Sequence, residues 1–115
     1  MKENKLVDLS MDFAINIIKL CETIKGHYSL VNQLERSATS IGANIREANY
    51  GQSKADMLSK FEIALKECSE TEGWLQLLYN TKDIDGTTYK NHRNLCGRIR
   101  RMLIASCITL KENEK

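Results

Sequence analysis

The sequence predicts an all-α protein, an antiparallel up-down four-helix bundle formed by one domain over residues 1–115. Three observations predict this class. The chain of 115 residues contains no proline and only six glycines, a composition that suits long helices better than a sheet. Apolar residues recur at helical spacing along most of the chain. Short breaks divide the chain into four such stretches, which favours antiparallel packing of neighbouring helices.

The four helices are expected at about residues 8–25, 29–50, 53–79 and 88–110. Gly26 is suited to a left-handed cap after the first helix. A short break beginning at Gly51 separates the second helix from the third, and Ser53 and Asp56 are spaced as a capping pair. Thr87 is the expected cap of the fourth helix.

The second and third helices form the predicted centre of the fold. Their core-facing stripes are expected to contain Leu30, Leu34, Ala38, Ile41, Ile45 and Ala48, and then Met57, Phe61, Leu65, Cys68, Leu75 and Tyr79. Glycine in mid-helix costs roughly 1 kcal/mol relative to alanine. We therefore expect that packing around Gly42 requires its small size.

One carboxylate interrupts the stripe of the third helix. Glu72 falls between two apolar positions, and burying it ionised and unpaired would cost on the order of several kcal/mol. We expect a buried polar network made of Gln33, Ser37, Asn44 and Glu72. Our interpretation is structural, with the network fixing helix register, because no histidine or nucleophile accompanies the carboxylate. A proton-handling or ligand site is the alternative.

The residues that usually carry chemistry form no recognisable catalytic or metal site. The four cysteines Cys21, Cys68, Cys96 and Cys107 are widely spaced in or beside apolar stripes, as is typical of small buried hydrophobic residues. No Cys-x-x-Cys pair is present. We expect neither an enzyme nor a cofactor. The chain shows no export signal and no apolar run near the ~20 residues of a membrane span, so we expect a cytoplasmic protein without a membrane partner.

Surplus apolar residues occur on the outward faces of three predicted helices. This set comprises Met11, Ile15, Ile18, Ile63, Trp74, Leu77, Ile104 and Ile108. Isolated exposed apolar residues need no explanation, but three sets together predict buried contacts between subunits. We therefore expect a homo-oligomer. The surface around Trp74, taken as exposed, is also a candidate contact for a protein partner.

The last helix is predicted to be basic. Residues 85–115 carry seven positive and three negative side chains, whereas residues 1–50 carry six of each. The candidate phosphate-contacting residues are Lys90, Arg93, Arg98, Arg100 and Arg101. Such a face can attract RNA or DNA electrostatically. It can equally be a solvated face, since basic residues favour the C-terminal halves of helices and no aromatic residue is interleaved for base stacking.

Two motifs resemble the 23S rRNA-intervening-sequence proteins, a family of four-helix bundles that includes bacterial members. They are QLERSATSIGANIREA at residues 33–48 and FEIALKE at residues 61–67, the latter followed by Glu70-Thr71-Glu72. The motifs lie at the family spacing, although many members have proline where this chain has Gly42. The resemblance adds no catalytic residue.

The resemblance also implies assembly and partners. It implies a ring-like homo-oligomer, a pentamer. A related bundle, the accessory variability determinant of diversity-generating retroelements, engages nucleic acid and a reverse transcriptase through a basic oligomeric surface. RNA, DNA and a protein such as a reverse transcriptase are therefore candidate partners. Two functions remain open at this point, a nucleic-acid-binding accessory protein and a protein-interaction scaffold whose arginines are merely solvated.

Overall fold

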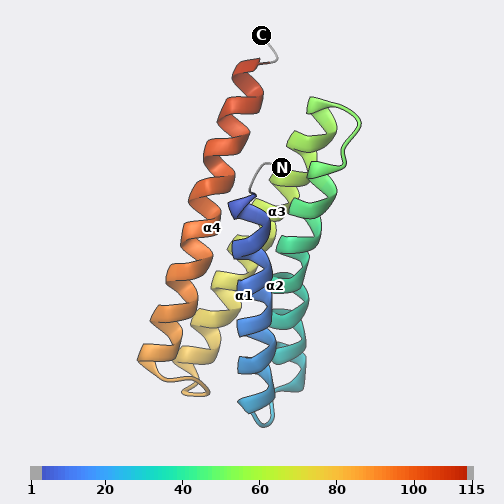
Figure 1. The fold of residues 1–115 in the computed structure, drawn as a ribbon. Helices are drawn as coiled ribbons and strands as arrows, with labels where there is room; N and C mark the ends of the chain where they lie inside the picture. Colours follow the sequence, from blue (N-terminus) through green and yellow to red (C-terminus); the bar gives the residue numbers. More distant parts are fainter. Residues whose placement is uncertain (1–3, 114–115) are drawn as a thin grey trace.

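A computed structural model describes residues 4–113, and this part of the chain forms four helices and no strand. The helices are α1 (Lys5–Thr23), α2 (Tyr28–Asn49), α3 (Lys54–Asn80) and α4 (Gly86–Asn113). Figure 1 shows successive helices running in opposite directions. Each helix packs on the next, and α4 packs on α1, whereas the diagonal pairs within the described residues make no close backbone approach. The prediction of an all-α fold with four helices is confirmed.

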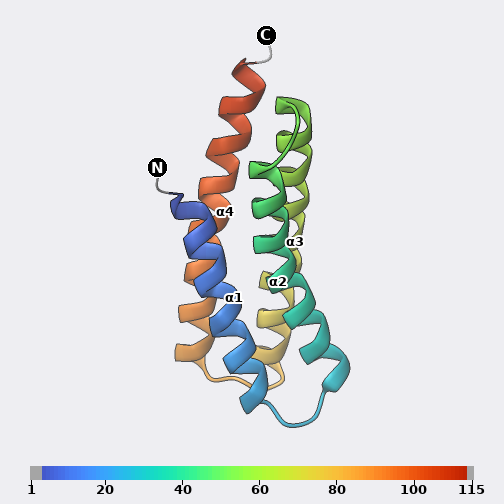
Figure 2. The same cartoon turned by 45° about the vertical axis from the view of Figure 1, so that its right-hand side comes forward.

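The helices differ in length, and this shapes one end of the bundle. α1 has 19 residues and α4 has 28. Figure 2 shows the C-terminal end of α4 and the α2–α3 tip extending beyond the start of α1. α1 begins three residues earlier than predicted because the side chain of Asn4 accepts a hydrogen bond from the backbone N–H of Val7. Even so, three helices alone form the end of the bundle near Tyr50.

Two predicted caps can be compared with the structure. The Ser53 hydroxyl accepts a hydrogen bond from the backbone N–H of Asp56 at 3.1 Å, which confirms the capping pair. Thr87 does not cap α4. The carboxylate of Asp85 accepts from the backbone N–H of Thr88 at 2.8 Å, and this bond lowers the pKa of Asp85. α4 therefore begins two residues before its predicted start.

The connection between α1 and α2 is short, and two of its residues have left-handed backbone conformations. Gly26 has the predicted left-handed conformation, with a φ of +83°, and His27 follows with a φ of +49°. That region is uncommon for a residue with a side chain. Gly26 is not the cap, because α1 ends two residues earlier than predicted, at Thr23, with Ile24 as its C-cap. The imidazole of His27 lies 3.5 Å from the carboxylate of Asp83 in the α3–α4 connection. Two chain reversals thus meet at the same end of the bundle.

The core draws apolar side chains from all four helices. Its largest fully buried apolar members are Phe13, Ile17, Leu34, Ile41, Ile45, Leu75, Leu78, Ile99 and Leu103. All four cysteines are buried with them, as their positions in the apolar stripes predicted. Burial raises the pKa of the Cys21 thiol to about 11. This thiol therefore stays protonated near neutral pH and behaves as a hydrophobic group.

The buried stripe of α3 differs from the predicted one. Ala64, Thr71 and Leu78 are fully buried, whereas Leu65 is half-buried and Tyr79 is 41% exposed. α3 packs between α2 and α4, so both of its flanks are partly covered. The stripe predicted from the large apolar residues is therefore rotated about the helix axis, away from the centre of the buried arc of α3.

The predicted buried polar network is wrong in most of its members. Ser37 is fully buried, and its hydroxyl oxygen lies 2.8 Å from that of Thr71 in α3. Gln33 is exposed, and the Asn44 side chain donates to a backbone carbonyl of its own helix. Glu72 is half-buried and turns toward α4 instead of α2. The helix rotation just described accounts for the difference.

Glu67 occupies the position that the sequence assigned to Glu72. Its side chain is 12% exposed, and the guanidinium of Arg36 in α2 lies 3.3 Å from it and 3.4 Å from Glu70. Burial and the neighbouring Glu70 raise the pKa of Glu67. Hydrogen bonding with Glu67 lowers the pKa of Glu70. The two carboxyl groups therefore lie beside one arginine at the edge of the α2–α3 contact, with their pKa values shifted in opposite directions.

Replacing Glu67 with glutamine should make the protein less sensitive to rising pH. A carboxyl group whose folded pKa is raised stabilises the fold in acid and loses that contribution as pH rises through the folded pKa. Glutamine stays neutral and can still donate to Glu70. Glu67→Gln should therefore equal or exceed the wild type in stability at neutral pH and match it in acid, as measured by urea unfolding from about pH 4 to about pH 8.

Glu70→Gln is the matched control with the opposite sign. The folded pKa of Glu70 is lowered, so its contribution is present above its ordinary pKa and is lost as pH falls. This variant should be less stable than the wild type at neutral pH and should converge with it in acid. A Glu67→Gln protein clearly less stable at neutral pH would mean that the ion pair with Arg36 outweighs burial.

Gly42 tests how tightly α1 and α2 approach. A Cβ at this position would lie 3.4 Å from Oγ of Ser10 and 3.6 Å from its Cβ, so a methyl group fits and glycine itself is not required. Gly42→Ala should be as stable as the wild type or more stable by up to about 1 kcal/mol in thermal unfolding. Gly42→Leu should lose roughly 1–3 kcal/mol by separating the helices. A large loss in Gly42→Ala would contradict this geometry.

Candidate nucleic-acid interface

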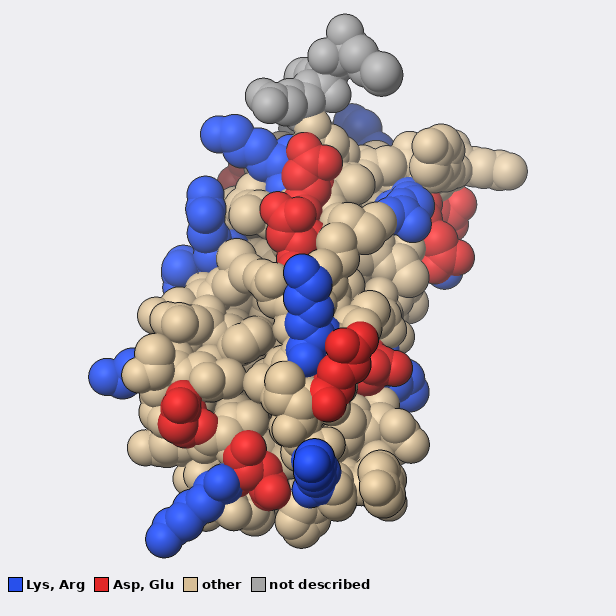
Figure 3. Space-filling view, turned by 60° about the horizontal axis from the view of Figure 1, so that its bottom comes forward, with Lys and Arg blue, Asp and Glu red and all other residues tan. Residues whose placement is uncertain are grey.

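The predicted basic residues lie on α4 and are mostly open to solvent. Lys90, Arg93, Arg98 and Arg101 are exposed, and none of them forms an ion pair with another residue in the described part of the chain. Figure 3 shows Lys and Arg side chains along the left-hand edge, where α4 lies, while positive and negative groups alternate elsewhere on that face. These cations are therefore available to an external ligand.

Arg100 differs from its neighbours because it has an acidic partner. It is half-buried, and its Nε donates to the carboxylate of Glu72 at 3.0 Å. This hydrogen bond raises the pKa of Arg100. The pair ties α3 to α4 and fixes the direction of the Arg100 guanidinium. Glu72 and Arg100, predicted to belong to a polar network and to a basic face respectively, are in contact in the structure.

Aromatic rings lie next to the basic face, which the sequence analysis missed. The rings of Tyr79 in α3 and Tyr89 in α4 are stacked, with centroids 4.7 Å apart and planes inclined by 1°. The guanidinium carbon of Arg93 lies 5.2 Å from the centroid of Tyr89, which is within cation–π range. Tyr89 precedes Arg93 by one helical turn, and this spacing could have predicted their contact from the sequence. Tyr79 was predicted to lie in the core, and nothing in the sequence indicated that it would stack on Tyr89.

Gly97 is buried beneath two arginines of the basic face. A Cβ at this position would lie 3.4 Å from an Nη of Arg101 and 3.6 Å from an Nη of Arg100. A methyl group at this position would be in ordinary van der Waals contact with both guanidinium groups, which lie over the helix backbone. Because Glu72 accepts from Nε of Arg100, the outer nitrogen atoms of that guanidinium are not used by the ion pair.

The apolar residues predicted to form an interface are exposed, with one exception. The following side chains are each 38–52% exposed: Met11, Ile15, Ile18, Ile63, Leu77, Ile104 and Ile108. Trp74 contradicts the prediction of an exposed indole, because it is half-buried and packs against the core. Its Nε1 is shielded from solvent and has no hydrogen-bond acceptor. The indole therefore packs mainly against the bundle.

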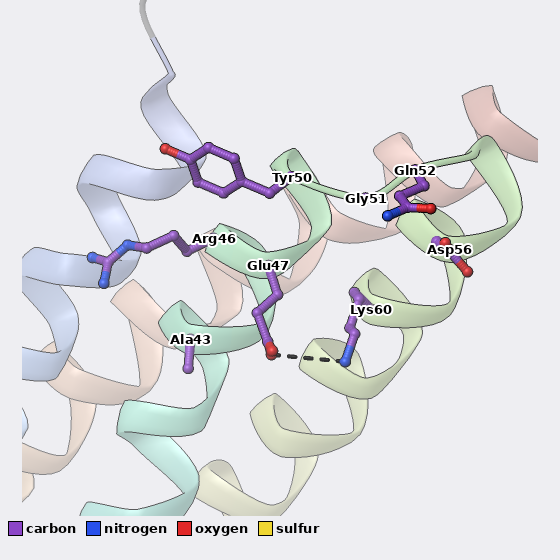
Figure 4. A pocket seen from close by; sticks show the side chains of 8 residues that line it. All are labelled: Ala43, Arg46, Glu47, Tyr50, Gly51, Gln52, Asp56 and Lys60. Carbon is purple, nitrogen blue, oxygen red and sulfur yellow. Dashed lines mark ion pairs between the residues drawn. The ribbon is translucent and has the colours of Figure 1, made fainter.

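A depression of the surface with a volume of about 840 Å³ lies at the α2–α3 tip. Figure 4 shows Glu47 and Lys60 facing each other across it, while Arg46 and Tyr50 point away toward α1. Glu47 and Lys60 lie 3.8 Å apart. Every lining residue except Lys60 is exposed. The depression is therefore shallow and of mixed charge, and it places no nucleophile beside a base.

Other kinds of site receive little support from the residues described. Within that part of the chain, no three His, Cys, Asp or Glu side chains are grouped so that they could hold a metal ion. The thiol of Cys96 donates to the backbone carbonyl of Cys68 inside the core. No helix among these residues is both long and apolar enough to cross a membrane. The basic face of α4 is the surface with the clearest chemical character.

Fold and surface together define a four-helix-bundle protein whose last helix is cationic. The sequence model of the 23S rRNA-intervening sequence proteins matches residues 2–105, and the chain belongs to this family. It is also similar to a crystal structure of a protein of unknown function from the S23 ribosomal protein family of Bacteroides thetaiotaomicron. That protein is 41% identical, with a TM-score of 0.84 over 89% of this chain and 97% of the other. No curated protein matches the chain.

Proposed function

We propose that this protein is a non-enzymatic accessory factor that binds RNA or DNA through the basic face of α4. One observation carries the proposal. Lys90, Arg93 and Arg101 are exposed and lie within about 80° of one another around α4, without an acidic partner among the described residues. Cations already neutralised inside a protein gain little from an added phosphate. Free ones displace the counterions that surround nucleic acid, which is favourable at low salt.

The absence of enzymatic activity is part of the proposal. Glu72 was the carboxylate considered as an acid or base, and Arg100 engages it at 3.0 Å. The ion pair ties α3 to α4 beside the exposed cations of the basic face, which is a structural role and needs no chemical step. We therefore treat Glu72 as a structural residue.

We further propose that copies of the chain assemble into a ring, with the pentamer taken from the family resemblance. The support is that exposed apolar residues occupy two different faces. Met11, Ile15 and Ile18 line a groove of about 240 Å³ between α1 and α2. Ile104 and Ile108 lie on α4, near the pair formed by its Lys111 and an acidic residue of α3. A contact between two unlike faces repeats from copy to copy and can close into a ring.

Assembly would strengthen the binding that one copy provides. Each added copy presents another basic face at a fixed distance, so later contacts with the same nucleic acid become intramolecular. A weak charge on a single chain is thereby converted into avidity.

Charge reversal on α4 should abolish nucleic-acid binding. The double variant Arg93→Glu/Arg101→Glu should lose affinity for labelled RNA and DNA oligonucleotides in fluorescence anisotropy. Affinity of the wild type should fall steeply between about 50 mM and about 200 mM salt. The matched control is Lys25→Glu/Lys54→Glu, which makes the same change in net charge at two exposed lysines outside α4. Absent or salt-independent binding at low salt would refute the proposal, as would equal losses in both double variants.

The ring can be tested by mixing two variants, each of which lacks a different one of the two proposed contact faces. In sedimentation at micromolar concentration, the wild type should form a closed oligomer. Ile15→Glu and Ile108→Glu should each be single chains, because each lacks one of the two faces. An equimolar mixture should give dimers and nothing larger, since each pair retains one intact contact. A monomeric wild type would remove the assembly, and dimers in either variant alone would indicate a different contact.

A protein-interaction scaffold is the second candidate, and the surface of α3 favours it. Ile63 and Leu77 are 42% and 40% exposed beside the half-buried Trp74, and a depression of about 340 Å³ adjoins the indole. An apolar surface with a buried aromatic anchor is typical of protein contacts. This surface could serve a partner such as a reverse transcriptase, as the resemblance implies. The scaffold function requires no binding by the arginines of α4.

A further inference from the structure

We propose that the groove between α1 and α4 binds a nucleoside monophosphate, with the phosphate at Lys19 and the base on the floor beside His92. The groove has a volume of about 510 Å³, which lies within the range of sites for small organic ligands. Its residues on α4 lie about 80° or more around the helix from Lys90 and Arg101. The inference therefore does not depend on the proposed binding of nucleic acid at the basic face.

Two neighbouring helices form this groove over two turns each. Its lining residues lie within residues 16–23 of α1 and residues 88–95 of α4, a length of about 10 Å along the axes. Because the two helices run in opposite directions (Figure 1), Lys19 and His92 lie at about the same level, near the middle. Leu20 and His92 are half-buried and form the floor, whereas Lys19 is exposed at the rim. The groove therefore offers different chemistry at its floor and at its rim.

The floor supplies a hydrogen-bond acceptor between apolar side chains. Nδ1 of His92 lies 2.7 Å from the backbone carbonyl oxygen of Thr88. A carbonyl oxygen only accepts, so Nδ1 must carry the hydrogen, and Nε2 of the neutral imidazole carries a lone pair. Leu20 and Leu95 lie beside the imidazole as groove residues. A flat base with an amino group at its edge, as in adenine or cytosine, can donate to Nε2 and cover the two leucines.

The rim supplies a positive charge and two amides. Lys19 forms no ion pair with another described residue, and none of the groove residues in that part of the chain is acidic. A phosphate group gains a charge-assisted hydrogen bond from the Lys19 ammonium. Asn16 and Asn91 also line the groove, and each side-chain amide offers a donor and an acceptor to a sugar or a base. A ligand that combines an anion with a flat, hydrogen-bonding body matches both levels.

Equilibrium dialysis of the wild-type protein with radiolabelled adenosine 5′-monophosphate tests the proposal. Salt is held at about 0.15 M, where charges on other faces are largely screened. Binding should saturate at one nucleotide per chain. Adenosine lacks the phosphate and ribose 5-phosphate lacks the base, so each should compete about tenfold or more weakly than the unlabelled nucleotide. Inorganic phosphate retains only the charge and should compete least.

Two variants separate the phosphate from the base. Lys19→Gln removes the charge at the rim, so affinity for adenosine 5′-monophosphate should fall roughly 3- to 10-fold while affinity for adenosine stays unchanged. His92→Phe keeps a flat ring without the acceptor, so both ligands should weaken by the same factor, roughly 2- to 10-fold. Lys54→Gln is the matched control, since Lys54 is exposed at the start of α3 and outside the groove. Lys19 is also exposed, so Lys19→Gln remains decisive if His92→Phe unfolds.

The outcomes separate this inference from the proposed function. No saturable binding at about 1 mM nucleotide, equal losses in Lys19→Gln and Lys54→Gln, or competition by inorganic phosphate as strong as by the nucleotide would overturn the groove site. Arg93→Glu/Arg101→Glu should keep the mononucleotide whether or not it loses oligonucleotides. Displacement by a 5′-phosphorylated oligonucleotide would support the site and identify its ligand as the end of a strand. Specific loss in Lys19→Gln without such displacement would support a free nucleotide.

Discussion

The contact between α2 and α3 is the constraint on which the rest of the structure depends. It is the most extensive helix pair in the bundle. Apolar stripes bring the two helices together, but such stripes tolerate sliding and rotation because hydrophobic contact is not directional. The polar edge of the interface is directional. The hydroxyls of Ser37 and Thr71 meet inside it, and Arg36 reaches the carboxylates of Glu67 and Glu70 at its margin. These pairs allow one register and one rotation of α3.

That rotation determines what α3 presents to α4. With Glu67 and Thr71 turned toward α2, the opposite flank of α3 carries Glu72 and Tyr79 toward α4, where they meet Arg100 and Tyr89. The candidate nucleic-acid interface is therefore built by two helices, although nearly all its charge comes from one. A rigid α2–α3 pair is useful to such a site, because a stacked ring and an oriented guanidinium lose less conformational entropy when a ligand binds.

Features of this molecule that depend on local sequence could be predicted, whereas features that depend on how the helices pack could not. Helix number and the basic character of α4 depend on spacing and composition, which are local properties. Glu72, Tyr79 and Trp74 were misplaced because α3 is covered on both flanks, so the largest apolar residues do not mark the centre of its buried arc. Ala64 and Thr71 mark it better, since close approach of α2 selects small side chains. A tyrosine contributed by another helix gives no signal in the sequence around the arginines.

The atoms nearest to each helical glycine show whether packing requires a glycine at that position. Each costs helix stability of roughly 1 kcal/mol relative to alanine, so each invites a structural reason. At Gly42 the nearest atoms belong to Ser10 of the neighbouring helix, and at Gly73 no atom lies within reach. At Gly97 the nearest atoms are guanidinium nitrogens of the same helix. Flexible arginine side chains could move away from a methyl group, so packing alone does not require glycine there.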